Sequence, residues 1–147
     1  MREIKFRAWD EEKKRMFDGD AIEEHDLITG LSYGKLFVAT EDPDWREMTV
    51  MQFTGLHDKN GREIYEGDLV RNHRRVSVYG DEILKVIYQE AVITESPDGV
   101  RWTSEKPGFR FIRIGKGMIT AFVPHEDLEV IGNIYENPEL LQSEKRV

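Results

Sequence analysis

The stretch Met51–Val70, MQFTGLHDKNGREIYEGDLV, contains a strand, a tight turn and a second strand. Two turns can close this hairpin, and they set different residues opposite each other. A two-residue type I′ loop at positions 60–61 would place like charges across from one another twice, which destabilises a strand pair. This loop is therefore disfavoured.

The alternative is a three-residue loop. Lys59 and Asn60 then form the centre of a type I turn, and Gly61 takes the left-handed conformation of a G1 bulge. Asp58 then faces Arg62, so opposite charges meet. We predict this second loop.

The predicted loop also fixes the pairs further along the two strands. Leu56 falls opposite Ile64, and Gly55 falls opposite Tyr65, where the missing side chain leaves room for the ring. The Glu66-Gly67-Asp68 triplet then interrupts the second strand, because glycine inside a strand often marks a bulge or bend.

Composition describes an acidic chain of 147 residues with a net charge of −8 and no cysteine. The length fits one domain. The missing cysteines exclude disulfides, a thiolate nucleophile and cysteine-bound zinc, and they suit a reducing compartment. No apolar run has the length of a membrane helix. We expect a cytoplasmic protein without a membrane partner, and the negative charge disfavours general binding to nucleic acid.

The N-terminal third predicts a β-rich segment. Residues 3–9 alternate like a half-buried strand, and a charged turn leads to a second short strand at 16–17. Another strand is expected within 31–40, followed by an acidic, proline-containing loop at 41–44 that is the best candidate boundary. We therefore expect an N-terminal β segment at 1–44 packed on a barrel domain at 45–142, with a frayed tail at 143–147.

Beyond the central hairpin the chain continues in short apolar and β-branched runs. Turn signals and glycines separate these runs, although the pattern of the first also admits a helix. The expected strands span 83–94, 100–103, 109–114, 118–123 and 128–135. Gly132 is expected to mark a bulge, and Asn137 with Pro138 predicts an N-cap and a short helical turn. Such spacing favours a mainly β fold, a small barrel or sandwich.

Three segments resemble the YopX family of bacteriophage and prophage proteins. They are REIKFRAWD at 2–10, the central stretch at 51–70 and VIGNIYENPELL at 130–141, in matching order and spacing. The resemblance implies a small SH3-like barrel, a phage or prophage origin and self-association. It carries no activity and no catalytic residues with it.

No catalytic constellation is recognisable in the sequence. The serines lack a nucleophile elbow and no phosphate-binding loop is present. His25 lies among carboxylates, but a single imidazole without a second histidine at a suitable spacing is more typical of a solvated loop than of a metal site. His57 is expected to form a polar pair with Glu63. We expect no catalytic residues, no metal, no cofactor and no enzyme activity.

One basic group is a candidate interaction surface. If neighbouring strands bring its members together, it would suit RNA, single-stranded DNA or an acidic protein. The alternative is a solvated loop that balances local acid. The candidate residues are Arg71, His73, Arg74, Arg75, Arg110 and Arg113.

Trp9 is a candidate for self-association. The predicted N-terminal strand would leave its large ring on an exposed face, and a second subunit would remove the ring from water. The alternative is that Trp9 folds onto its own barrel.

These observations favour a non-catalytic interaction module of phage or prophage origin, forming a homo-oligomer with a host or phage protein as a further partner. One alternative is a nucleic-acid-associated protein that uses residues 71–75. Another is an acidic mimic of DNA that uses loops such as 41–44 to occupy a host DNA-binding protein.

Overall fold

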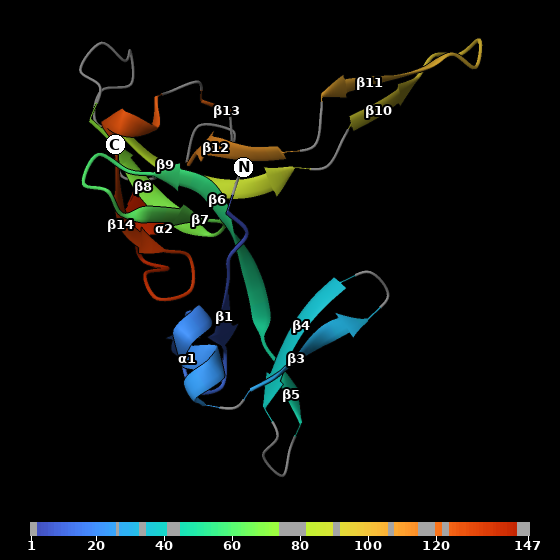
Figure 1. Ribbon diagram of the computed structural model, residues 1–147. Coiled ribbons are helices and arrows are strands. Elements are labelled where there is room, and N and C mark those ends of the chain that lie inside the picture. The colour runs from blue at the N-terminus through green and yellow to red at the C-terminus, as the bar shows by residue number, and fades with distance from the viewer. Residues whose placement is uncertain are drawn as a thin grey trace.

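The computed structural model describes residues 3–25, 27–32, 35–40, 45–73, 82–89, 92–105, 108–114, 120–121 and 124–143. The chain is mainly β, as the sequence predicts (Figure 1). Its strands are β1 Phe6–Asp10, β2 Arg15–Phe17, β3 Ile28–Ser32, β4 Lys35–Thr40, β5 Arg46–Glu47, β6 Thr49–His57, β7 Glu63–Tyr65, β8 Asp68–Asn72, β9 Glu82–Gln89, β10 Val92–Glu95, β11 Arg101–Glu105, β12 Gly108–Arg113, β13 Thr120–Ala121 and β14 Leu128–Asn133. Its helices are α1 Gly19–Glu24, the 3-10 turn η1 His125–Asp127 and α2 Leu140–Ser143.

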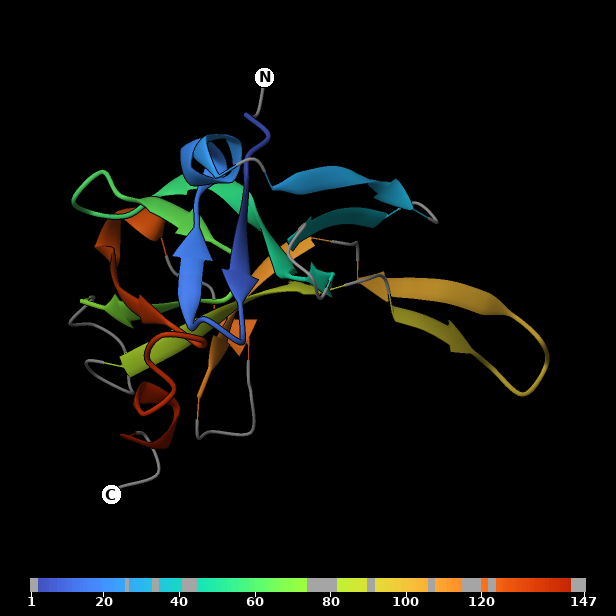
Figure 2. The ribbon, with the colours of Figure 1, turned by 90° about the horizontal axis from the view of Figure 1, so that it is seen from below.

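The strands of the described residues form four antiparallel sheets. Their orders are β2-β1-β6-β7, β3-β4-β5, β13-β12-β9-β8-β14 and β10-β11. The five-stranded sheet is curled, and the hairpins β3–β4 and β10–β11 project away from the rest of the chain in both views (Figures 1 and 2). None of the helices among the described residues has the length and hydropathy needed to cross a membrane.

The central turn has the predicted three-residue form. The N–H of Gly61 donates to the carbonyl of Asp58 at 3.0 Å, and Gly61 has φ +82°. His57 lies opposite Glu63 in the register of β6 and β7. The Asp58 side chain adds a stabilising element, since its Oδ1 accepts the N–H groups of Asn60 and Arg62 at 2.9 Å each.

Beyond the turn the predicted register is wrong. Phe53, not Gly55, pairs with Tyr65, and the predicted Leu56–Ile64 pair is absent from the register between the two strands. Gly55 has φ +89°, which makes a bulge in β6. The Thr54 hydroxyl donates to the carbonyl of Ile64 at 2.8 Å. This side chain therefore supplies a hydrogen bond between β6 and β7 where the backbone ladder is interrupted.

The predicted interruption at Gly67 is confirmed. Gly67 has φ +88° and lies between β7 and β8, and its N–H donates to Val86 of β9 at 2.8 Å. Asp68 follows, and its Oδ2 accepts the N–H of Tyr65 at 2.7 Å. This corner joins the β6–β7 hairpin to the five-stranded sheet.

Apolar side chains pack in three clusters. Leu69 and Val70 are neighbours in β8 but belong to different clusters, because successive strand residues point to opposite faces. On one face of the five-stranded sheet lie Ile64, Val70, Leu84, Val86, Leu128 and Val130. On the other, Leu140 and Leu141 of α2 cover the face that carries Leu69. The third cluster joins β1 and β2 to β4 through Ala8, Phe17 and Val38.

Two segments differ from what the sequence alone predicts. The Asp18-Gly19-Asp20 triplet, which reads as a break after the expected strand at 16–17, instead begins helix α1, because the Asp18 side chain accepts the N–H of Ala21 and caps it. Near the C-terminus a helical turn forms as expected, but Asn137 does not cap it with its side chain. The Oδ1 of Asn137 accepts the N–H of Asn133 at 3.2 Å, next to the predicted bulge in β14.

Candidate functional site

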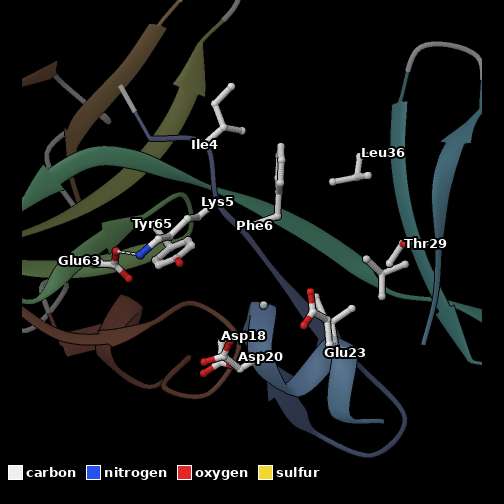
Figure 3. A pocket seen from close by; sticks show the side chains of 13 residues that line it. Ile4, Lys5, Phe6, Asp18, Asp20, Glu23, Thr29, Leu36, Glu63 and Tyr65 are labelled. Atoms are coloured by element: carbon white, nitrogen blue, oxygen red, sulfur yellow. Dashed lines mark hydrogen bonds and ion pairs between the residues drawn. The ribbon is translucent and has the colours of Figure 1, made fainter. Parts of the chain in front are cut away.

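A groove of about 570 Å³ lies between β1, α1, the β3–β4 hairpin and β7 (Figure 3). It brings together segments that are distant in the sequence. Its lining is Ile4, Lys5, Phe6, Asp18, Gly19, Asp20, Ile22, Glu23, Thr29, Leu36, Val38, Glu63 and Tyr65.

One side of the groove is apolar. Phe6 stands on β1, and Leu36 points toward it from β4 (Figure 3). Val38 lies at the base and is part of the buried cluster with Ala8. Ile4 is 66% exposed at the mouth, so this side offers apolar surface to a ligand.

The β7 side is polar. Lys5 Nζ donates to Glu63 Oε2 at 2.6 Å, and this hydrogen bond raises the pKa of Lys5. Tyr65 lies beneath, and burial raises the pKa of its hydroxyl. The Arg7 guanidinium stacks over the Tyr65 ring at 4.7 Å. These contacts fix the β1 side of the groove to β7.

A buried ion pair supports this wall from behind. Arg7 Nη2 donates to Asp68 Oδ1 at 2.7 Å, and the same carboxylate accepts the N–H of Tyr65. Burial raises the pKa of Asp68, while Arg7 opposes that shift. A buried pair of this kind is costly to break, because removing one partner leaves the other charge uncompensated.

The α1 side carries three carboxylates, from Asp18, Asp20 and Glu23 (Figure 3). Asp18 caps the helix, whereas Asp20 and Glu23 are exposed and form no ion pair within the described part of the chain. With Glu63, the lining holds four carboxylates against one lysine, a net charge of −3. The groove is therefore apolar on one side and acidic on the other.

Among the basic residues singled out by the sequence, those that the structure describes do not form one surface. Arg110 and Arg113 are three positions apart in β12, so the strand points them to opposite faces. Arg113 donates from Nε to Glu82 Oε2 at 3.1 Å, and the Glu82 side chain is 2% exposed. Asn72 also donates to Glu82, so Arg113 belongs to a buried polar cluster.

Arg71 and Arg110 lie on the other face of the same sheet. Arg71 pairs with Ile83 and Arg110 pairs with Ile87, which places Lys85 of β9 diagonally between them. His73 follows β8, with Nε2 at 2.9 Å from Glu129 Oε1. Arg74 and Arg75 lie outside the described residues, as do the acidic loop at 41–44 and the tail at 144–147.

Trp9 does not present an exposed ring to a second subunit. It is 3% exposed and stacks on Tyr135 with ring centroids 5.8 Å apart. Its Nε1 donates to Glu11 at 2.7 Å. The exposed-face expectation is wrong because the C-terminal segment covers this ring, and the alternative that Trp9 folds onto its own chain is correct.

The histidines make local contacts. His25 Nε2 lies 3.0 Å from Arg15 Nη2, and the His25 ring packs edge-on against Phe17. His57 also packs edge-on, against Phe53, while Glu63 is occupied by Lys5, so the expected polar pair is absent. Within the described ranges, no three histidine, aspartate or glutamate side chains converge as a metal site would require.

The sequence did not reveal the groove. Asp18 three residues before Ala21 is an N-cap signal that would have placed a helix after β2. Even so, the approach of that helix to Leu36 and Glu63 depends on long-range packing that no local pattern records.

The geometry is that of a mainly β protein with an apolar and acidic groove beside its N-terminal strand. The family model described as YopX protein matches residues 5–142, so the chain belongs to the YopX family. It is also similar to the crystal structure of protein EF1440 from Enterococcus faecalis, with 25% sequence identity and a TM-score of 0.50. That match covers 96% of this chain and 99% of the other. A comparison with curated proteins gives no match.

Proposed function

We propose that this protein is a non-catalytic interaction module of phage or prophage origin that binds a protein partner in the groove beside β1. Family membership supports the origin. The proposal includes an SH3-like barrel formed by the curled sheet and the central hairpin, a homo-oligomeric state and a location in the bacterial cytoplasm.

The observation that carries the binding role is the lining of the groove. Apolar side chains of β1 and β4 face open space. The net charge of −3 makes the site favour a positively charged ligand over a negatively charged one. The exposure of the carboxylates supports a non-catalytic role. Asp18, Asp20 and Glu23 are exposed and Glu63 is half-buried, whereas catalytic acids are usually desolvated to shift their pKa.

Site-specific photo-crosslinking tests the proposal. A benzoyl-phenylalanine in place of Leu36 should capture a protein partner in cells, whereas the same probe in place of Glu24, on the outside of α1, should not. Thr29→Trp is then added to the protein that carries the probe at position 36, where it fills the groove from an exposed position of β3. The amount of adduct should fall by about tenfold or more, because the bulky ring excludes the partner from the groove.

Thr49→Trp is the matched control, because Thr49 is exposed and lies outside the lining. Equal adducts with both tryptophan variants would contradict the proposal. An adduct of twice the mass of the chain would identify the partner as a second copy.

A second candidate rests on the diagonal of Arg71, Lys85 and Arg110 on one sheet face. Cations in such a row suit a phosphate backbone, although the charge of −8 opposes it. A labelled single-stranded oligonucleotide that binds less with rising salt, and binds less to Lys85→Gln than to Lys59→Gln, would favour it. The acidic loop at 41–44, on which a DNA mimic would depend, lies outside the described residues.

A further inference from the structure

At Phe6, the first residue of β1, the described part of the chain leaves one edge of the strand open. Phe53 donates its N–H to the carbonyl of Lys5 at 2.9 Å, so the backbone groups of Lys5 point toward β6. In an antiparallel pair, successive residues direct their backbone groups to opposite sides. The N–H and C=O of Phe6 therefore point away from β6.

No strand occupies that side of Phe6 in the described part of the chain. The β1–β2 ladder runs from Asp10 to Ala8, where Ala8 pairs with Phe17, and β2 ends there. Asp18 then begins α1, which turns the chain away from the strand direction. An edge of this kind is a template for another strand.

The groove lies at this edge. Ile4 and Lys5 directly precede β1, and the carbonyl of Lys5 continues the pairing with β6. By strand alternation Ile4 and Phe6 share one face and Lys5 is on the other, yet all three line the groove. A space that contacts both faces of one strand must wrap around its edge. Figure 3 shows the same arrangement, with Phe6 beside Leu36 and Lys5 directed toward Glu63.

We propose that the groove takes an extended segment of a partner protein, in which basic and apolar residues alternate, as an added strand on the open edge of β1. This inference rests on the proposed function and specifies its ligand. The backbone of the segment bonds to Phe6, which supplies affinity without sequence preference, and the side chains supply specificity.

The alternation follows from the two sides of the groove. Side chains of an added strand point alternately to its two faces, as those of β1 do. One set meets the apolar surface of Phe6 and Leu36, and the other meets the side that carries Tyr65, Glu63 and Asp18. Cationic side chains suit the second set, because the lining has a net charge of −3.

The open edge limits the length of the segment. Counted from Ile4, two residues before β1, to Arg7, it would run for about 13 Å at the rise of a strand. A seven-residue probe therefore spans it. The probe is a fluorescein-labelled peptide of alternating valine and lysine, with valine at both ends, and its control has glutamate in place of lysine.

Two measurements test the inference on the intact protein. In fluorescence anisotropy the lysine peptide should bind about tenfold or more tightly than the glutamate peptide. In ¹⁵N NMR the exchange of the Phe6 amide should slow by about tenfold or more in the complex. The Arg7 amide is the internal control, because Arg7 pairs with Met51 and its N–H already faces β6.

Charge variants test the acidic side. Asp20→Asn with Glu23→Gln should weaken binding of the lysine peptide by about threefold or more. Glu24→Gln with Glu139→Gln removes the same charge from exposed positions outside the lining and should leave binding unchanged.

Three results would overturn the inference. The first is equal affinity for the two peptides, and the second is binding of the lysine peptide without slower exchange of the Phe6 amide. The third is slower exchange of the Phe6 amide that depends on protein concentration alone, because this would assign the edge to a second copy of the chain. Capture of a partner from position 36 together with failure of the lysine peptide would leave the proposed function standing and reject the added strand.

Discussion

The central hairpin and the β3–β4 hairpin are both antiparallel strand pairs but lie in different surroundings. At the central turn, Asp58 Oδ2 accepts the N–H of Val130 in β14 at 2.8 Å, and Lys59 donates its N–H to Leu128 at 2.8 Å. In the other hairpin Leu31 is 76% exposed, and Trp45, just before β5 and next to the Phe37 ring of β4, is 58% exposed. Local strand pairing is common to both, whereas hydrogen bonds to β14 hold the tip of the central hairpin.

The largest test of this comparison removes the bonds that close the central hairpin. Asp58→Ala should lower the free energy of unfolding by about 3 kcal/mol, because three N–H groups lose a charged acceptor in a buried setting. Urea denaturation measures the change. A loss below about 1 kcal/mol would show that the carboxylate contributes little to closure.

The pH dependence of this effect sharpens the test. Burial alone would raise the Asp58 pKa, but the N–H groups of Val130, Arg62 and Asn60 together hold it below its ordinary value of 3.8. The unfolded chain therefore takes up this proton first as pH falls. The stability that Asp58 contributes should be full above its unfolded value and lost as pH falls through its lower folded value. The difference between wild type and Asp58→Ala should shrink over that acidic range, and a constant difference would contradict the assignment.

A smaller effect is expected at the tip of the same turn. Gly61→Val should destabilise by about 1 kcal/mol or more, because a β-branched residue fits the left-handed region badly. No atom lies within 4 Å of a Cβ at this position, so strain of the backbone is the cause rather than a clash. Gly61→Asn is the control and should cost less, since asparagine tolerates that region. An unchanged midpoint and slope for valine would count against the turn.

The smallest effect is expected in the open hairpin. Leu31→Ser should change the free energy of unfolding by less than about 0.5 kcal/mol, because the side chain is already in water. Leu69→Ala, at a leucine with no exposed surface, should cost about 3 kcal/mol in the same assay. Similar losses at the two leucines would remove the contrast between closed and open regions.

Local chemistry accounts for the features that the sequence predicted. The turn at Asp58–Gly61 and the interruption at Gly67 follow from charge pairing and from glycine at positive φ. Both depend on residues within a few positions of each other. The first hairpin, which pairs Trp9 with Met16, is equally local and was also expected.

Contacts between residues far apart in the sequence account for most of the features that the sequence did not predict. The register of β6 shifts because Thr54 bonds across to Ile64 and Gly55 bulges, and a simple alternating pattern does not encode either event. The burial of Trp9 depends on Tyr135, which lies at the other end of the chain. The separation of Arg110 from Arg113 follows from the strand period, because residues three positions apart point to opposite faces.

The bond between Asp58 and Val130 links residues 72 positions apart and has a consequence for synthesis. A ribosome releases the central hairpin long before β14, so during translation the Asp58 carboxylate has only its local N–H partners. Contacts of such separation slow folding, because a long loop must close before they form. A nascent chain halted before Leu128 should therefore carry a formed turn on an unfinished sheet, and completion of the domain should coincide with emergence of its last strand from the exit tunnel.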